Sequence, residues 1–181
     1  MGPPLLEDHE NNLAISQMAA IVFYLGEQLN LMPEKTASKA ITIKVLDDCT
    51  DLLAEITRSN GAHMWSQPDW DDFMATRFVR WQEIFEQTAI KNGVTENQYY
   101  FASANAGVAD LAVHALFATM ERCLPGLSPT LRHNAPLVMS VCDRISQNSG
   151  IIDLVAKQTV AHGKLYCGGE IEKSIRGVMG E

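Results

Sequence analysis

Residues 3–26 read PPLLEDHENNLAISQMAAIVFYLG, and this stretch decides how the whole chain is interpreted. Two short apolar runs, 4–7 and 12–15, flank a polar turn, a pattern typical of two strands joined in a hairpin. Ser16 is suited to cap the helix that follows, which we expect to continue to about Leu29. The order of strand, turn, strand and helix predicts a small α/β unit at the start of the chain.

Most of the later sequence has the apolar periodicity of helices. The first long helix is predicted over 36–59, and a second is predicted to begin at Pro68, with Asp69 as its cap. A later helix starts at either Ser128 or Pro136. The large aromatic side chains of this region are expected in the core rather than in a ligand pocket; they are Trp65, Trp70, Phe73, Trp81 and Phe85.

These patterns predict a mostly helical (α) fold with a small α/β part at the N-terminus. A short linker at 32–37 separates residues 1–31 from an all-helical domain at 38–158. The last residues, 159–181, are rich in glycine and weakly periodic, so we expect an extended or partly disordered tail.

Charge and composition narrow the classes of function. The chain has 181 residues and a net charge of −8, with no cluster of Lys and Arg. Nucleic-acid binding uses a basic surface, so we expect no nucleic-acid partner. No apolar run is long enough to cross a bilayer and no signal-peptide pattern opens the chain, so we expect no membrane contact and a cytoplasmic location. The four cysteines lie far apart and are expected to be reduced thiols, without a metal; they are Cys49, Cys123, Cys142 and Cys167.

Two motifs carry a resemblance to a known family. One is Gln17-x-x-Ala20-Ile21-x-x-Tyr24-Leu25-Gly26, and the other is Gly107-Val108-Ala109-Asp110-Leu111. With these motifs, residues 3–158 resemble the glutathione S-transferases. The resemblance implies that 1–31 is the last part of a thioredoxin-like, glutathione-binding domain and that 38–158 is the all-helical C-terminal domain. We therefore expect the sequence to be truncated at its N-terminus.

The resemblance implies a glutathione site at the start of the chain. In the family, a cis-proline begins the third strand, and the preceding residue offers its backbone to the cysteinyl part of glutathione. Pro4 fits that proline with Pro3 supplying the backbone, unless Pro3 is itself the cis residue. Gln17 matches the side chain that holds the γ-glutamyl carboxylate at a helix N-terminus, where free amides and the helix dipole attract an anion. Met18 replaces the usual Ser or Thr, so only its backbone N–H can contribute, and a purely structural helix start is the alternative.

An acidic stripe on the first long helix has two interpretations. Asp47, Asp51 and Glu55 recur every four residues, and such a stripe is most simply a solvated face. In some members of the resembled family, an acidic residue of this helix reaches the glutathione ammonium across a dimer interface. Asp51 is the candidate for that role, and the resemblance also implies a homodimer.

The second motif has a structural role. Gly107 takes the cap position of a Ser/Thr-x-x-Asp box, in which Asp110 bonds back to the cap amide. A glycine there costs only a few tenths of a kcal/mol relative to serine.

Taken together, the resemblance implies a glutathione S-transferase-like protein acting in detoxification. Glutathione is the co-substrate, no other cofactor is expected, and a hydrophobic electrophile would bind between the first two long helices. None of the tyrosines matches the thiol-activating residue, so no catalytic residue is expected in this chain. The alternatives are a non-catalytic interaction and assembly module of the same fold, or an unrelated helical bundle with a chance hairpin.

Overall fold

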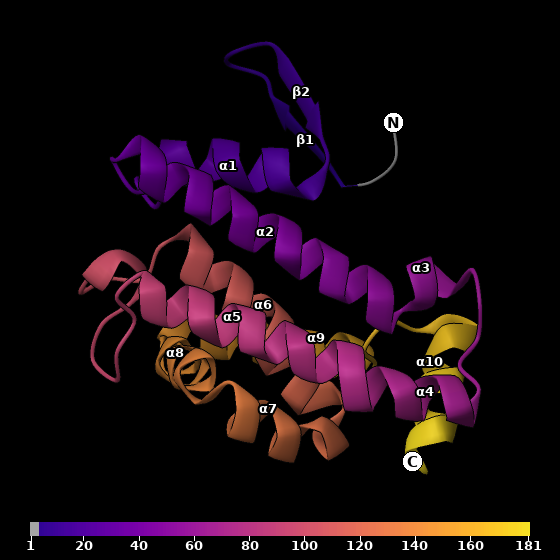
Figure 1. Ribbon diagram of the computed structural model, residues 1–181. Helices are drawn as coiled ribbons and strands as arrows, with labels where there is room; N and C mark the ends of the chain where they lie inside the picture. The colour runs from indigo at the N-terminus through magenta and orange to yellow at the C-terminus, as the bar shows by residue number, and fades with distance from the viewer. Residues whose placement is uncertain (1–3) are drawn as a thin grey trace.

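The structure is a computed structural model that describes residues 4–181, so Pro3 lies outside the described residues. A two-stranded hairpin and one helix precede a bundle of helices (Figure 1). The first elements are β1 (Leu5–Asp8), β2 (Leu13–Ser16), α1 (Met18–Gln28), α2 (Thr36–Ile56), α3 (Arg58–Gly61), α4 (Gln67–Phe73), the π-helical η1 (Met74–Phe78) and α5 (Val79–Lys91). The later ones are η2 (Tyr100–Ala102), α6 (Val108–Cys123), η3 (Pro125–Leu127), α7 (Ser128–Asn134), α8 (Pro136–Ser146), α9 (Ser149–His162) and α10 (Gly169–Met179).

The hairpin is held to α1 through its turn. Strands β1 and β2 are antiparallel, and each begins one residue later than the sequence pattern predicted. In the turn, the Asp8 carboxylate accepts the backbone N–H groups of Glu10 and Asn11, both at 3.0 Å. The Tyr24 hydroxyl of α1 donates to the same carboxylate. Asp8 therefore fixes both the turn and the position of the helix beneath it.

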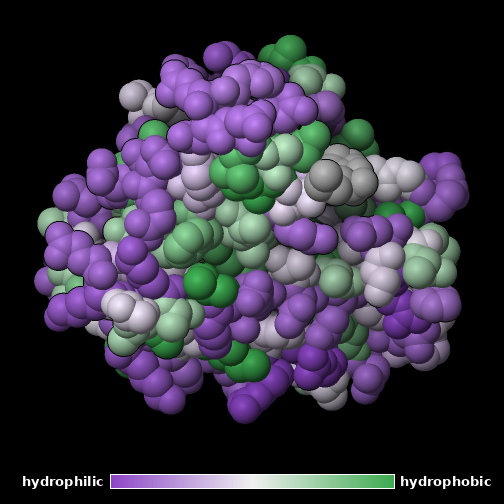
Figure 2. All heavy atoms as spheres, turned by 90° about the horizontal axis from the view of Figure 1, so that it is seen from above, coloured by the Kyte–Doolittle hydropathy of each residue, from purple (hydrophilic) through white to green (hydrophobic). Residues whose placement is uncertain are grey.

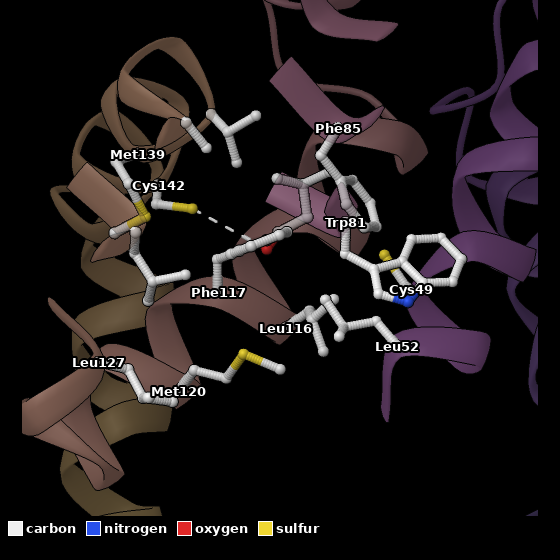
Figure 3. Close-up of a cluster of buried hydrophobic side chains, with 14 of the residues drawn as sticks. Cys49, Leu52, Trp81, Phe85, Leu116, Phe117, Met120, Leu127, Met139 and Cys142 are labelled. Carbon is white, nitrogen blue, oxygen red and sulfur yellow. Dashed lines mark hydrogen bonds between the residues drawn. The ribbon is translucent and has the colours of Figure 1, made fainter. Parts of the chain in front are cut away.

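The core of the bundle lies where α6 passes behind α2 and α5 (Figure 1). The rings of Phe85 and Phe117 meet edge to face, with 4.9 Å between centroids. Figure 3 shows Phe117 of α6 between Phe85 on one side and Met139 and Cys142 of α8 on the other. The five aromatic residues predicted for the core are all buried.

Glycines allow α1, the linker and α6 to meet closely. The Val108 N–H donates to the Leu31 carbonyl at 3.0 Å, which ties the start of α6 to the linker. A Cβ at Gly107 would lie 2.9 Å from that carbonyl oxygen, and a Cβ at Gly26 would lie 2.6 Å from a methyl carbon of Val108. A larger residue at Gly107 therefore requires the Leu31 backbone to move, and one at Gly26 requires the side chains of Val108 and Met32 to move.

Several helix boundaries differ from the prediction. Ser16 ends β2 instead of capping α1, because Gln17 takes the cap position. The second long helix begins at Gln67, one residue before the predicted Pro68. Ser66 is its cap in place of Asp69, because the Ser66 hydroxyl accepts the Asp69 N–H at 3.3 Å. The alternatives Ser128 and Pro136 both begin helices, α7 and α8.

The C-terminal residues contradict the predicted extended tail. α9 continues to His162, and α10 buries Ile171 and Ile175 against the end of α3. The Glu172 carboxylate accepts hydrogen bonds from the backbone N–H groups of residues 166–168 at 3.0, 2.8 and 3.2 Å. It also accepts a hydrogen bond from the Arg176 side chain. The glycines of the connection hid this helix, because they lower the local periodicity while serving the turn between α9 and α10. No helix within residues 4–181 has the length and apolar character to cross a membrane.

Candidate functional site

The start of α1 has an unusual backbone. Gln17 has φ 77° and ψ 121°, in the region with positive φ that residues other than glycine rarely adopt. Its side chain is exposed and makes no capping hydrogen bond. The first helical hydrogen bond runs from the Ile21 N–H to the Gln17 carbonyl at 3.0 Å, so the amides of the preceding residues have no partner within the helix. No acidic side chain lies in the first turn, so these amides are available to an anion.

The hairpin brings Pro4 to the same end of the unit as Gln17 and Met18. Leu5 pairs with Ser16, so the residue before Leu5 lies beside the residue after Ser16. Pro4 is exposed there, and Met18 is half-buried as the first residue of α1. Figure 2 views this side of the molecule and shows apolar side chains among the polar ones on it. Three of the predicted binding residues thus share one surface, and Pro3 lies outside the described residues.

Asp51 lies apart from this group. It is exposed on α2, and no hydrogen bond or ion pair within residues 4–181 involves its side chain. Of its two neighbours in the acidic stripe, Asp47 is exposed, while Glu55 accepts a hydrogen bond from Arg77 Nε at 3.1 Å. Within this chain Asp47 and Asp51 face solvent, whereas Glu55 is half-buried.

Gly107 and Asp110 form one half of a capping box. Asp110 is 1% exposed, and its Oδ2 accepts the Gly107 N–H at 2.9 Å. Its Oδ1 accepts the Tyr100 N–H at 3.0 Å, a contact that the sequence motif did not indicate. Burial raises the pKa of this carboxyl, and the hydrogen bonds from the Gly107 and Tyr100 amides oppose that rise. The residue organises the loop before α6 as well as the helix itself.

A cleft of about 400 Å³ lies between the end of α2 and the α4–η1 segment. This is the space between the first two long helices, where a hydrophobic electrophile was expected. Its apolar surface comes from Ala54, Trp65 and Phe73, but ionisable side chains make up most of the lining. Those side chains are Glu55, Arg58, His63, Asp69, Asp72 and Arg77.

The hydroxyls of Tyr24, Tyr100 and Tyr166 all have a raised pKa. The hydrogen bond to Asp8 raises the pKa of Tyr24. Burial raises the pKa of Tyr100 and of Tyr166, whose hydroxyls have no hydrogen-bond partner within the described residues. A thiol-activating hydroxyl needs access to the ligand and a pKa that lets it stabilise a thiolate.

The family model described as "Glutathione S-transferase, C-terminal domain" matches residues 41–178. The match covers well over half of the chain, so the chain belongs to the glutathione S-transferase C-terminal domain family. It includes α10 and begins inside α2, so it does not extend to the hairpin or to α1. Comparison with curated proteins finds no match.

Proposed function

We propose that this chain binds glutathione and belongs to a transferase that joins the glutathione sulfur to an electrophilic carbon. The observation that carries the proposal is the positive φ of Gln17 at the start of α1. Backbone strain of this kind costs on the order of 1–3 kcal/mol and concentrates at ligand sites. In this position it accompanies unpartnered amides that suit the γ-glutamyl carboxylate.

The proposed ligand contacts come from residues at one end of the hairpin. Gln17 holds the γ-glutamyl carboxylate through its side-chain amide, and the Met18 N–H adds a backbone donor. Pro4, with Pro3 before it, lies beside the cysteinyl part. Asp51 would reach the ammonium of glutathione only from a second copy of the chain, so its role depends on a homodimer. The thioether of Met18 donates no hydrogen bond, and we expect millimolar rather than micromolar affinity.

Calorimetric titration of glutathione tests this site. A hydrogen bond to a charged carboxylate contributes about 1.5–3 kcal/mol, so Gln17→Ala is expected to weaken binding about tenfold to 100-fold. Gln28→Ala is the matched control, because Gln28 is exposed at the other end of α1. Equal affinities of the two variants, or no heat at about 10 mM glutathione, would contradict the proposal.

The proposed reaction is attack of the glutathione thiolate on a hydrophobic electrophile in a cytoplasmic detoxification role. The sulfur forms a bond to carbon, and either a leaving group departs or a proton is added to the adduct. No residue among 4–181 is assigned to thiol activation. Turnover of an activated aryl halide with glutathione by the purified protein is the direct assay.

A second candidate function is a non-catalytic interaction module. Met18 favours it, because it removes a side-chain donor from the glutathione site. The two candidates differ in a binding experiment: a module that has lost the site gives no glutathione binding, yet it keeps the helical domain intact.

A further inference from the structure

The charged cleft beyond the end of α2 has features that the glutathione proposal does not use. It lies where α2 ends and α3 and α4 follow, near the end of the bundle that carries α10 (Figure 1). We call it the Arg58 cleft and define it by Arg58, Asp69, Asp72, Trp65 and Phe73. Its volume of about 400 Å³ falls in the range of small-molecule sites.

Arg58 has an incompletely satisfied guanidinium. Its Cζ lies 4.6 Å from the centroid of the Trp65 ring, a cation–π contact that holds the group in place. The nearest carboxylate oxygen, on Asp69, is 3.7 Å from the terminal nitrogen, too far for a hydrogen bond. Within residues 4–181 the guanidinium donates no hydrogen bond, and its Nε is buried without a partner. Its terminal nitrogens are held in place and pair only loosely with Asp69, so they can donate to a ligand carboxylate.

Asp72 supplies an unneutralised negative charge to the same cleft. Its carboxylate has no hydrogen bond or ion pair within the described part of the chain, and the residue is exposed. The other arginine of the lining, Arg77, is already paired with Glu55. The cleft therefore presents one cation, Arg58, that has no hydrogen-bonded partner, and one anion, Asp72, that has neither a hydrogen bond nor an ion pair within the described part of the chain. Trp65 and Phe73 also line the cleft, and their ring centroids lie 5.0 Å apart.

The backbone around the cleft is strained on both sides. Arg58, Ser59 and Asn60 have φ of 50°, 54° and 57°, three successive left-handed residues that are not glycine. Residues other than glycine rarely adopt this conformation, and a run of three is rarer still. On the facing helix, the π-helical turn Met74–Phe78 follows α4, and π turns are frequent at functional sites.

We propose that the Arg58 cleft binds a zwitterionic ligand, an α-amino acid or short peptide with an apolar side chain. The ligand carboxylate takes the free donors of Arg58, its ammonium faces Asp72, and its side chain lies against Phe73. A simple anion would meet the uncompensated charge of Asp72, and a simple amine would leave Arg58 without a hydrogen-bonded carboxylate. The site is distinct from the one at Gln17 and does not rest on glutathione binding.

Calorimetry with three related probes tests this site. L-phenylalanine carries both charges, 3-phenylpropionate lacks the ammonium, and 2-phenylethylamine lacks the carboxylate. We expect L-phenylalanine to bind at least tenfold more tightly than either analogue. Equal affinities for the three probes, or no binding of L-phenylalanine at about 10 mM, would overturn the proposal.

Substitutions locate the binding in the cleft. Arg58→Gln is expected to weaken L-phenylalanine binding about tenfold or more, whereas Arg80→Gln, an exposed arginine paired with Glu83, should leave it unchanged. Asp72→Asn changes an exposed side chain that supports no contact in the fold, and it should abolish the preference for L-phenylalanine over 3-phenylpropionate. Gln17→Ala should bind the probe like the unaltered protein. If Asp72→Asn keeps the preference for L-phenylalanine over 3-phenylpropionate, or if Arg58→Gln and Arg80→Gln bind L-phenylalanine equally, the ligand does not bind in this cleft.

Discussion

Two buried carboxylates each accept hydrogen bonds from backbone N–H groups that lie outside their own helix. Asp110 accepts the amides of Gly107 and Tyr100, and Glu86 of α5 accepts the Leu137 N–H at 3.1 Å at the start of α8. Hydrogen bonds to a charged acceptor are the stronger kind, and the donors would be left buried without it. Single residues therefore hold loops and helix ends in place.

Asp110→Ala is expected to lower the free energy of unfolding by about 2–4 kcal/mol, because two backbone N–H groups lose their acceptor. The matched control is Asp47→Ala, which removes an exposed carboxylate of α2. Urea unfolding followed by circular dichroism measures both. Similar midpoints for the two variants would show that Asp110 contributes no structural hydrogen bonds.

The Asp8–Tyr24 contact predicts a measurable titration. The hydrogen bond from Tyr24, with those from Asn11 and Glu10, lowers the pKa of Asp8 from 3.8 to about 2. The ionised Asp8 carboxylate therefore stabilises the folded chain at pH values above the pKa that Asp8 has in the unfolded chain. This stabilisation is lost as the pH falls through about 2. In Tyr24→Phe the pKa of Asp8, followed by NMR, should move back toward 3.8. A pKa unchanged by the substitution would mean that the tyrosine makes no such bond in solution.

At the scale of elements, the junction of α1, the linker and α6 depends on close backbone approach. Gly107→Ala is expected to destabilise the fold by about 1–3 kcal/mol, since its Cβ would lie 2.9 Å from the Leu31 carbonyl oxygen. Gly177→Ala is the matched control: it lies inside α10 with open space around its Cβ position, and it should stabilise by up to about 1 kcal/mol. The two melting temperatures should move in opposite directions. A shift of the same sign in both would contradict this account of the junction.

α10 gives a second prediction at this scale. Ile175 is fully buried, so Ile175→Ala should cost about 2–5 kcal/mol. Ile152 on α9 is 53% exposed, and Ile152→Ala should cost well under 1 kcal/mol. Chemical denaturation of both variants tests whether the C-terminal helix belongs to the cooperative fold. Equal, small losses in the free energy of unfolding for the two variants would mean that α10 does not contribute to the cooperative fold.

Elements with a strong local pattern were predictable from the sequence, and those set by tertiary contacts were not. The hairpin and the long helices followed from alternation and periodicity, to within a residue or a turn. The end of α2 was missed because residues 58–60 are left-handed, although none is glycine. α10 was missed because its support comes from Ile171 and Ile175 packing against a segment distant in sequence.

For the whole molecule, the family and the helical bundle were predictable, but the character of the sites was only partly so. The motif at Gln17 indicated a helix start, while its positive φ depends on how the hairpin enters α1. The resemblance implied a site between the first two long helices, where the Arg58 cleft lies, but not its charged lining, because Arg58, Trp65 and Asp72 meet only through the turn between α2 and α4. The spacing of charged residues along one helix does not indicate a site whose lining comes from more than one helix.

The most direct test of the central claim is an NMR titration of the ¹⁵N-labelled chain with glutathione. The account predicts that the amide signals of Gln17, Met18 and the first turn of α1 shift with a shared, saturable dependence on glutathione, while those of 58–60 do not. Shifts confined to the Arg58 cleft, or no saturable shift at the start of α1, would contradict a glutathione site at the start of α1.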